Sequence, residues 1–431
     1  MYRATQALTV LARLAPGPTP RALLEHRLAM IAGDLEHNPI FRPGELPDTH
    51  FMRLVIVDDE RGELPSLLAW ECNHDGLPDD YLAAVAHAAP DIDAVFECCA
   101  GYPAAGARDI DGWVAWMIAR SRRANAFYAG YRGIPRRAVV NDHLVPEASR
   151  DVLDGEDRIA LCGLPRSEIQ RRICEQVAAR HPDLDLSPEG PEGDDEPRWL
   201  IGKIAALALA VIVLVIALPF ALPLYMLLRR KESTDFASAY VRPVQVDRAV
   251  KAAEDRMAQN QLTHMVDIKP GAFRLWTLTF VLWALDIVAQ VYSVRGDLGG
   301  ITAIHFARWV ILYDERPRSE EPRRHRLLFF SNYDGSWESY LGEFIDRAAY
   351  GLTAVWSNTV GFPATENLAL GGARDEDAFK QWTREHQVLT QVWWSGAAGS
   401  TVQNIRDNVW IRRRLDRGLG DDELTTWLRK L

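Results

Sequence analysis

Two stretches of the chain are apolar on both faces and have nearly the same sequence. HFMRLVIV begins at His50 and HFARWVIL begins at His305. Runs of this length that are rich in β-branched and aromatic residues are typical of strands covered on both sides. After a charged turn, a second apolar run follows each of them, at 67–72 and at 327–331. The pattern therefore predicts a pair of strands in each region.

The elements that follow each strand pair also occur twice, in the same order. Asp-Gly closes the pair and precedes an amphipathic helix with an acidic residue in its first turn, where the helix dipole favours it. A third strand is predicted to end at Gly-aromatic-Pro, a second helix holds a tryptophan, and a fourth strand holds two aromatic residues. The corresponding positions are 75–76 and 334–335, 101–103 and 361–363, Trp116 and Trp382, and 127–128 and 393–394.

This internal repetition predicts two homologous domains of about 110 residues each, and repeats have to be identified before a fold is assigned. WMIARSRRANAFYAGYRG, which begins at Trp116, aligns without a gap with WTREHQVLTQVWWSGAAG, which begins at Trp382. The order of elements, β-β-α-β-α-β or a close variant, predicts an α+β protein in which each copy is a ferredoxin-like plait.

Two such plaits on one chain resemble the dimeric α/β-barrel superfamily, in which two units place their sheets face to face. IHFARWV and FSNYDGSWESYL are also similar to motifs of an uncharacterised bacterial group loosely linked to peroxidases. The resemblance covers about half of the chain. It implies a dimeric α/β-barrel-like unit, but the superfamily includes dye-decolourising haem peroxidases, chlorite dismutases, cofactor-free monooxygenases and binding proteins, so the fold alone does not select a function.

A long apolar segment separates the two copies. Residues 200–228, LIGKIAALALAVIVLVIALPFALPLYMLL, contain one charged residue, Lys203. This length exceeds the roughly 20 residues that cross a bilayer, so we expect membrane insertion. The basic residues 229–231 follow the segment and predict that its C-terminal flank is cytoplasmic. A second apolar segment, 273–294, could be an interfacial or packed helix, a true span or a core helix, and Asp286 within it would be costly in lipid.

A single span would place the two copies on opposite sides of the membrane. Three arrangements avoid this conflict: a hairpin bent near Pro219 and Pro223, a return span at 273–294, or copies that pair with other chains as a homo-oligomer. We favour soluble domains on the cytoplasmic side, attached to membrane lipid. The expected organisation is an N-terminal helical segment (1–45), a first plait (46–150), a helix with an acidic linker (151–198), a membrane segment (199–231), a helical linker (232–298) and a second plait (299–431).

Charge and cysteine content narrow the class of protein. The formal net charge is −10 and no basic stripe with interleaved aromatic residues is present, so nucleic acid is not expected as a partner. The five cysteines form no CxxC pair, which favours a reduced chain without a zinc site. Nucleotide-binding, serine-hydrolase and zinc-protease motifs are absent from the sequence.

The candidate catalytic residues are His305, Arg308, Asn332 and Asp334, and the candidate cofactor-binding residues are His305 and Trp356. Imidazole can ligate haem iron or transfer protons near neutral pH. Residues three apart in a regular strand face opposite ways, so His305 and Arg308 would not meet one ligand unless a bulge intervenes.

The turn that contains Asp334 is similar to part of the Gly-x-x-Asp-Gly motif of dye-decolourising peroxidases, although Ser331 stands where the first glycine would be. A turn and helix cap is the alternative explanation.

Two functional hypotheses follow. The first is a membrane-anchored oxidoreductase, peroxidase-like or monooxygenase-like, that acts on an apolar small molecule with or without haem. The second is a non-catalytic membrane protein that binds a lipid-like ligand or a partner protein through its paired plaits.

Overall fold

The structure is a computed structural model of an α+β protein with antiparallel sheets. It describes short pieces of the chain between 201 and 216 and the ranges 5–59, 61–103, 109–155, 163–187, 218–235, 244–291, 300–317 and 323–431.

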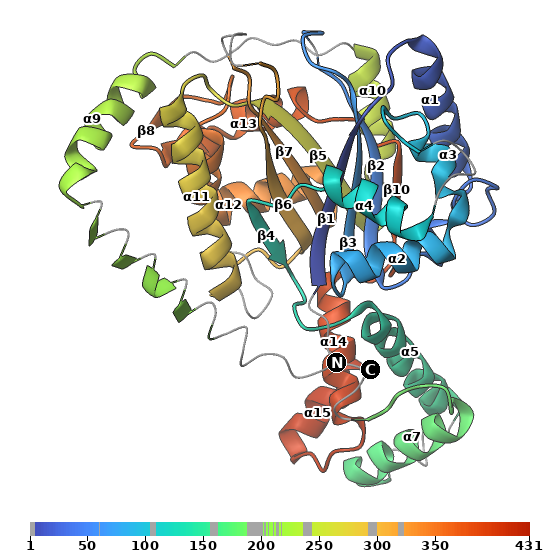
Figure 1. Cartoon of the computed structure of the whole chain (residues 1–431). Coiled ribbons are helices and arrows are strands. Elements are labelled where there is room, and N and C mark those ends of the chain that lie inside the picture. Colours follow the sequence, from blue (N-terminus) through green and yellow to red (C-terminus); the bar gives the residue numbers. More distant parts are fainter. Residues whose placement is uncertain are drawn as a thin grey trace.

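Two four-stranded antiparallel sheets lie face to face in the centre of the molecule (Figure 1). The first sheet has the strand order β1-β3-β2-β10 and the second has the order β4-β6-β7-β5. The strands are β1 (Thr5–Arg13), β2 (Thr49–Val57), β3 (Leu67–Asp75), β4 (Ala126–Ala129), β5 (Gln259–Asp267), β6 (Ile304–Leu312), β7 (Arg326–Asp334) and β10 (Val392–Ser395). Every residue of β2 and β6 is buried, as the apolar pattern on both faces of these strands predicts.

The two halves of the chain exchange their last strands. β10 comes from the second half and pairs with β2 of the first, whereas β4 comes from the first half and pairs with β6 of the second. The approach to each exchanged strand is fixed in the same way: Gln391 donates its N–H to the carbonyl of Leu54, and Asn125 donates to the carbonyl of Trp309. The two halves therefore meet within one chain, and pairing with other chains is not needed to complete either sheet.

Helices cover the outer face of each sheet, so the molecule has four layers (Figure 1). The first sheet is covered by α1 (Pro18–Gly33), α2 (Pro78–Ala88), α3 (Asp93–Phe96) and α4 (Ile110–Arg120), and the second by α11 (Ala272–Val291), α12 (Trp337–Trp356) and α13 (Glu376–Glu385). Several smaller elements accompany these layers. They are α10 (Val244–Ala253), β8 (Thr365–Glu366), β9 (Leu370–Gly371) and the short 3-10 helices η1 (Pro43–Glu45), η2 (Pro90–Ile92), η3 (Leu218–Phe220) and η4 (Gly372–Arg374).

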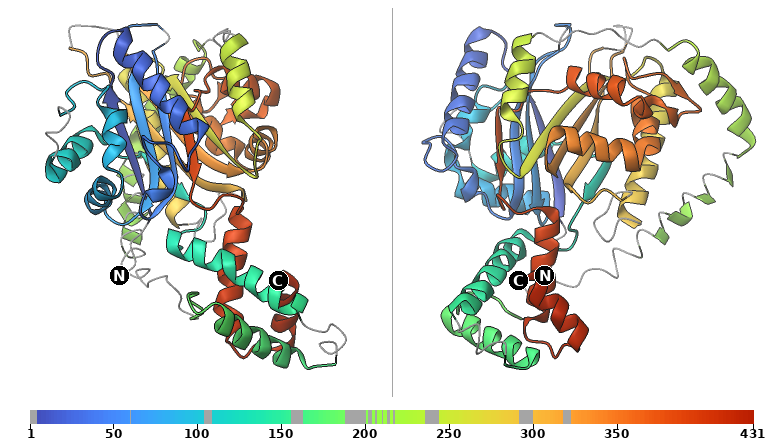
Figure 2. Two further views of the ribbon diagram at one scale, coloured as in Figure 1. Left: turned by 90° about the vertical axis from the view of Figure 1, so that its right-hand side faces the viewer. Right: turned by 180° about the vertical axis from the view of Figure 1, so that it is seen from behind.

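A separate group of helices lies beneath one end of the two sheets (Figure 2). The helix after each exchanged strand leaves the sheets and packs against its counterpart from the other half. The group consists of α5 (Arg136–Gly155), α7 (Arg166–Arg180), α14 (Val402–Leu415) and α15 (Asp421–Lys430). Its own apolar cluster includes Val145, Ile173 and Trp427. The predicted boundary at residue 150 therefore falls inside α5, which continues to Gly155.

Three sequence predictions of local structure are wrong. Residues 5–13 and 259–267, assigned to helical segments, are edge strands of the two sheets. The predicted third strand of each copy is absent. In the first copy its residues form α3 and a turn with a single β-bridge at Cys99, and in the second they form the end of α12 and a turn with a single β-bridge at Thr359. Short apolar runs fit a buried helix face as well as a strand, which explains this error.

Each half therefore begins with a strand and a helix that the predicted repeat omitted. Pro-Gly follows both strands, and Gly17 and Gly271 adopt φ values of 105° and 100°, which glycine tolerates best. α1 and α11 come next and occupy matching places on the two sheets. α11 is thus a packed helix of the second half: Leu278 and Leu282 are fully buried, and Asp286 accepts a hydrogen bond from the backbone N–H of Phe127 in β4.

Among the described residues, Ala272–Ala289 of α11 is the segment that is long and apolar enough to cross a membrane by length and composition, and 28% of it is buried. The predicted membrane segment, 199–231, lies partly outside the described residues. Its last part forms η3 and α9 (Ala221–Glu232), which stand away from the sheets on the side of α11 (Figure 1). No residue of α9 or η3 is buried, and large apolar side chains such as Leu218 and Phe220 are 71% and 62% exposed.

Candidate functional site

Two matching His-Asp pairs lie at the end of the sheets next to the group of helices. His50 Nε2 is 3.0 Å from Asp75 Oδ1, and His305 Nε2 is 2.7 Å from Asp334 Oδ1. The second oxygen of each carboxylate accepts the backbone N–H of the first residue of a helix, Arg136 of α5 (2.7 Å) or Val402 of α14 (2.8 Å). Each pair therefore fixes the position at which a helix leaves the sheets, and the helix dipole favours a carboxylate there.

Burial and charge act in opposite directions on the first of these carboxylates. Burial raises the pKa of Asp75, whereas the positive charge and hydrogen bond of His50 lower it, and the net pKa lies below the usual value.

β-bulges at both histidines turn them towards the space between the sheets. The register shifts between Thr49 and Phe51 in β2, and between Ile304 and Phe306 in β6. A bulge places two consecutive residues against one on the neighbouring strand. His305 and Arg308 consequently both face the other sheet, because the bulge removes the regular alternation that would turn them to opposite faces. The His305 ring lies 5.0 Å from the ring of Phe51 in the opposite sheet.

A buried ion cluster fills the middle of the space between the sheets. Arg53 donates to Glu71 (2.8 Å) and, in the other sheet, to the carbonyls of Leu262 (2.9 Å) and Ser331 (3.0 Å). Arg308 Nη2 lies 2.6 Å from the other oxygen of Glu71. The three ionised side chains are at most 1% exposed.

Arg308 mirrors Arg53 by donating to carbonyls of the first sheet, at Leu8 (2.7 Å) and Cys72 (2.8 Å). Asn332 accepts from Arg53 Nη2 (2.6 Å) and from the indole of Trp393 (2.9 Å). Burial lowers the pKa of both guanidinium groups and the Glu71 carboxylate opposes this shift. Arg308 and Asn332 therefore connect the two sheets.

Trp356 lies elsewhere, in the helix layer of the second half. Its ring packs against His264 (4.9 Å), Trp382 (5.3 Å) and Phe329 (5.7 Å). The cavity beside it has a volume of about 20 Å³, which is close to the space that one water molecule requires. The structure thus brings His305 and Asp334 together, places Arg308 and Asn332 farther along the same interior, and separates Trp356 from all four.

The residues around His305 do not fit a haem group. One ring nitrogen is engaged by Asp334, and the ring is packed against Phe51 and Tyr131, with centroids 5.0 and 5.6 Å away. An iron ligand needs an open face on which the porphyrin can lie, and apolar side chains occupy this space. Within the described ranges, no group of three or more His, Cys, Asp or Glu side chains is arranged to hold a metal ion.

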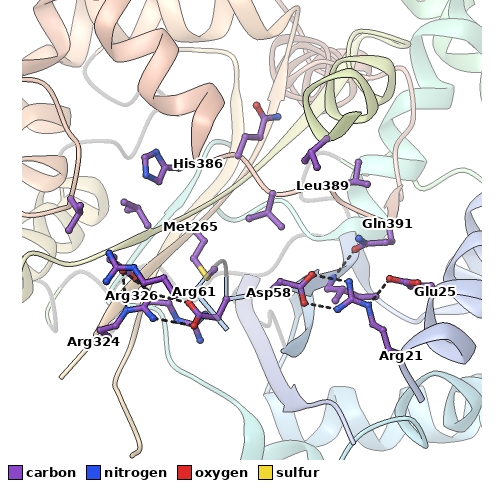
Figure 3. Close-up of a pocket in the computed structure, with 18 residues that line it drawn as sticks. Arg21, Glu25, Asp58, Arg61, Met265, Arg324, Arg326, His386, Leu389 and Gln391 are labelled. Carbon is purple, nitrogen blue, oxygen red and sulfur yellow. Dashed lines mark hydrogen bonds and ion pairs between the residues drawn. The ribbon is translucent and has the colours of Figure 1, made fainter. Parts of the chain in front are cut away.

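A cleft opens at the opposite end of the two sheets, which we call the end cleft (Figure 3). Its volume is about 570 Å³, within the range of small-molecule sites. Residues 386–391 form one wall, because they run along β5, where Val388 donates to the carbonyl of Thr263, and then cross to β2. Ends of β2 and β5, the start of β7, α1 and α10 supply the rest of the lining. None of the predicted site residues lines this cleft.

Two groups of charged side chains line opposite sides of the end cleft (Figure 3). On one side Arg21 pairs with Asp58 and Glu25, each at 2.6 Å. Arg324 on the other side pairs with Asp59 and Asp267, each at 2.9 Å. Apolar side chains occupy the wall between them, namely Ile56, Val246, Met265, Val266, Val360, Val388 and Leu389.

Arg326 also lines the end cleft and is 6% exposed. Burial lowers the pKa of its guanidinium group, and the carboxylates of Asp59 and Asp267 partly offset that effect. Arg326 is not among the site residues that the sequence predicted. Alternation could have identified it, because Arg326, Leu328 and Phe330 share one face of β7, the face that meets the first sheet.

Comparison of the chain with protein-family models, with curated proteins and with solved structures finds no match.

Proposed function

We propose that this chain is a membrane-attached, non-catalytic binding protein that holds an apolar small molecule in the end cleft. The observation that carries the proposal is the contrast between the two ends of the sheets. The predicted catalytic residues at one end and in the middle of the sheets are engaged in holding strands and helices, whereas the other end has an open volume of about 570 Å³ with apolar and charged walls.

The scaffold supports assignment to the dimeric α/β-barrel type. Each half has the order strand, helix, strand, strand, helices, strand, which is the order of a ferredoxin-like plait extended by one helix. The sheets face each other and exchange edge strands, as expected if the two plaits replace the two subunits of a dimer. Several members of that superfamily bind ligands without catalysis, so the scaffold is compatible with a binding role.

The exchange of strands restricts how the chain can meet a membrane. Both halves must lie on the same side of it, and α11 is committed to the second sheet and cannot serve as the return span. A hairpin in 200–228, turned near Pro219 and Pro223, satisfies both conditions. The limb before the turn, 200–218, would be about 28 Å long if helical, and the limb after it, α9 (Ala221–Glu232), is about 18 Å long, so neither exceeds a hydrocarbon core of about 30 Å.

The chain just beyond the apolar segment is attached to the second half. Asp235 accepts hydrogen bonds from Lys269 Nζ (2.8 Å) and Arg274 Nη2 (2.5 Å) at the start of α11. The outer face of α11 carries Trp276 (72% exposed) and Phe280 (45% exposed). An amphiphilic aromatic face of this kind suits the membrane interface. We infer that α9 and α11 mark the side of the molecule that rests on the cytoplasmic leaflet.

Membrane attachment is tested by an alkaline carbonate wash of membranes that contain the full chain, followed by labelling of single cysteines introduced after the five native cysteines have been replaced by alanine. Leu77→Cys and Val244→Cys introduce exposed thiols in the two halves, at positions that are 64% and 61% exposed. Both should resist an impermeant maleimide in intact cells and react after lysis. Release by the wash, or labelling of one site in intact cells, would contradict the hairpin.

The binding role is tested with octanol, a neutral apolar probe, by calorimetric titration of the full chain in nanodiscs, with empty nanodiscs subtracted. Binding should be saturable. Val388→Trp fills the cleft wall and should abolish it, whereas Val140→Trp, at a position on α5 that is 41% exposed and far from the cleft, should leave it unchanged. Equal binding by both variants would place the probe outside the end cleft.

A further inference from the structure

We propose that the ligand of the end cleft is an amphiphilic anion whose carboxylate or phosphate group binds Arg326. This inference rests on the proposed function and adds the chemical class of the ligand.

Arg326 is a buried cation with an unused hydrogen-bond donor, as far as the described part of the chain shows. The residue is 6% exposed, and its Nη1 has no hydrogen-bond partner among the described residues. A guanidinium group carries five N–H donors and stays charged, so a buried donor without a partner costs free energy. Arg53 and Arg308, the other arginines between the sheets, each bind Glu71 and backbone carbonyls.

The neighbouring carboxylates are bound to other groups. Asp59 accepts from Arg324 and from the backbone N–H groups of Glu63 and Leu64. Asp267 accepts from Arg324 at 2.9 Å and lies 3.5 Å from Arg61. Each carboxylate is therefore held in place without Arg326, and an external anion is the natural partner for its free donor.

The remainder of the lining indicates that the anion carries an apolar body. Met265 and Leu389 lie between Arg326 and Gln391 in Figure 3, and Val388 also lines the cleft. A small inorganic anion would leave these apolar side chains exposed to water. A molecule with one charged end and a short alkyl body would bury them, at about 25 cal/mol for each Å² of apolar surface.

The matching end of the other half has a much smaller cavity, which Arg326 also lines. There Arg13 and Arg122 both pair with Glu315, at 2.5 and 2.8 Å, and the cavity is about 80 Å³. Leu67 occupies the position on β3 that Arg326 occupies on β7. The second half alone therefore supplies a buried cation to an open cleft.

The test compares octanoate, octyl phosphate, inorganic phosphate and octanol on the full chain in nanodiscs by calorimetric titration. We expect the tighter-binding of the two amphiphilic anions to bind at least about tenfold more tightly than octanol. A hydrogen bond to a charged group is stronger than a neutral one by a free energy that corresponds to about tenfold in affinity. Arg326→Met should remove this preference and keep octanol binding. Arg326→Lys, which retains the charge without the planar fork, should keep part of it.

The outcomes separate the two levels of the proposal. Equal affinity for octanoate and octanol, both lost in Val388→Trp, would overturn the anion site and leave the binding function intact. Absence of binding by every probe would contradict the proposed function itself. Inorganic phosphate as the tightest ligand would overturn the amphiphile, and the ratio of octanoate to octyl phosphate distinguishes a fatty carboxylate from a lipid phosphate as the source.

Discussion

Glu71→Gln should destabilise the two-sheet unit strongly, because this carboxylate pairs with two buried arginines at once. Arg53 and Arg308 lie 2.8 and 2.6 Å from its two oxygens, and all three side chains are at most 1% exposed. The matching residue of the second half is Phe330, which cannot replace the charge. Glutamine has nearly the same shape, so the variant changes charge and leaves packing almost unaltered.

The expected loss follows from the two contacts. Each hydrogen bond between charged groups contributes about 1.5–3 kcal/mol, and the glutamine oxygen can retain one weaker bond. Breaking a buried ion pair by removing one partner costs about 3–5 kcal/mol. For a unit of this size, 1 kcal/mol corresponds to about 2 °C in Tm, so we expect a decrease of about 6–10 °C.

The assay is urea and thermal unfolding of the full chain, followed by tryptophan fluorescence. Glu315→Gln is the matched control, because Glu315 also pairs with two arginines but is 52% exposed, and pairs at the surface contribute about 0–1 kcal/mol. A loss below about 1 kcal/mol for Glu71→Gln, or equal losses for both variants, would refute the view that the ion cluster joins the sheets.

Three further predictions concern single side chains. Burial lowers the pKa of His74 to about 3, whereas in the unfolded chain it titrates near 6.5. The unfolded state therefore binds more protons between these pH values, and the free energy of unfolding should fall by about 2 kcal/mol from pH 7 to pH 5. His74→Tyr introduces the residue type of the matching position in the other half. The urea concentration at its unfolding midpoint should therefore change less with pH over that range. Gly130→Ala places a methyl group against the carbonyl oxygen of Ile304 and should cost about 1–3 kcal/mol in urea unfolding, whereas Gly33→Ala has open space and should not destabilise. His305→Ala leaves the buried carboxylate of Asp334 without its histidine partner, so it should lower the free energy of unfolding by about 1–3 kcal/mol and leave octanoate affinity unchanged. A Soret band that is present in the parent protein and lost in this variant would favour the haem hypothesis.

Local patterns predicted the central strands well because burial on both faces leaves a clear sequence signal. β2 and β6 are present where their apolar runs predict them, and β3 and β7 extend a few residues beyond their predicted ends. β1 and β5 were missed since each is an edge strand with polar residues, and its hydrogen bonds come from a partner about 60 residues away. Pro-Gly after both strands was the available signal.

The candidate site was harder to predict, because it depends on pairing between the halves. The four residues of β4 or β10 do not specify which sheet they join. Strand exchange places His305 and Arg308 inside a packed interior, and the bulge at His305 changes the face on which it lies. The end cleft forms where the chain crosses between sheets. Arg326 is notable because its Nη1 has no hydrogen-bond partner among the described residues, and no local sequence pattern reveals this.

The most direct test of the account is a crystal structure of the full chain with 8-bromo-octanoate, in which the anomalous signal of bromine locates the ligand. The account predicts bromine in the end cleft near Val388 and Leu389, with the carboxylate within hydrogen-bonding distance of Arg326. Bromine between the sheets beside His305, or a carboxylate that contacts other groups and leaves Arg326 free, would contradict it.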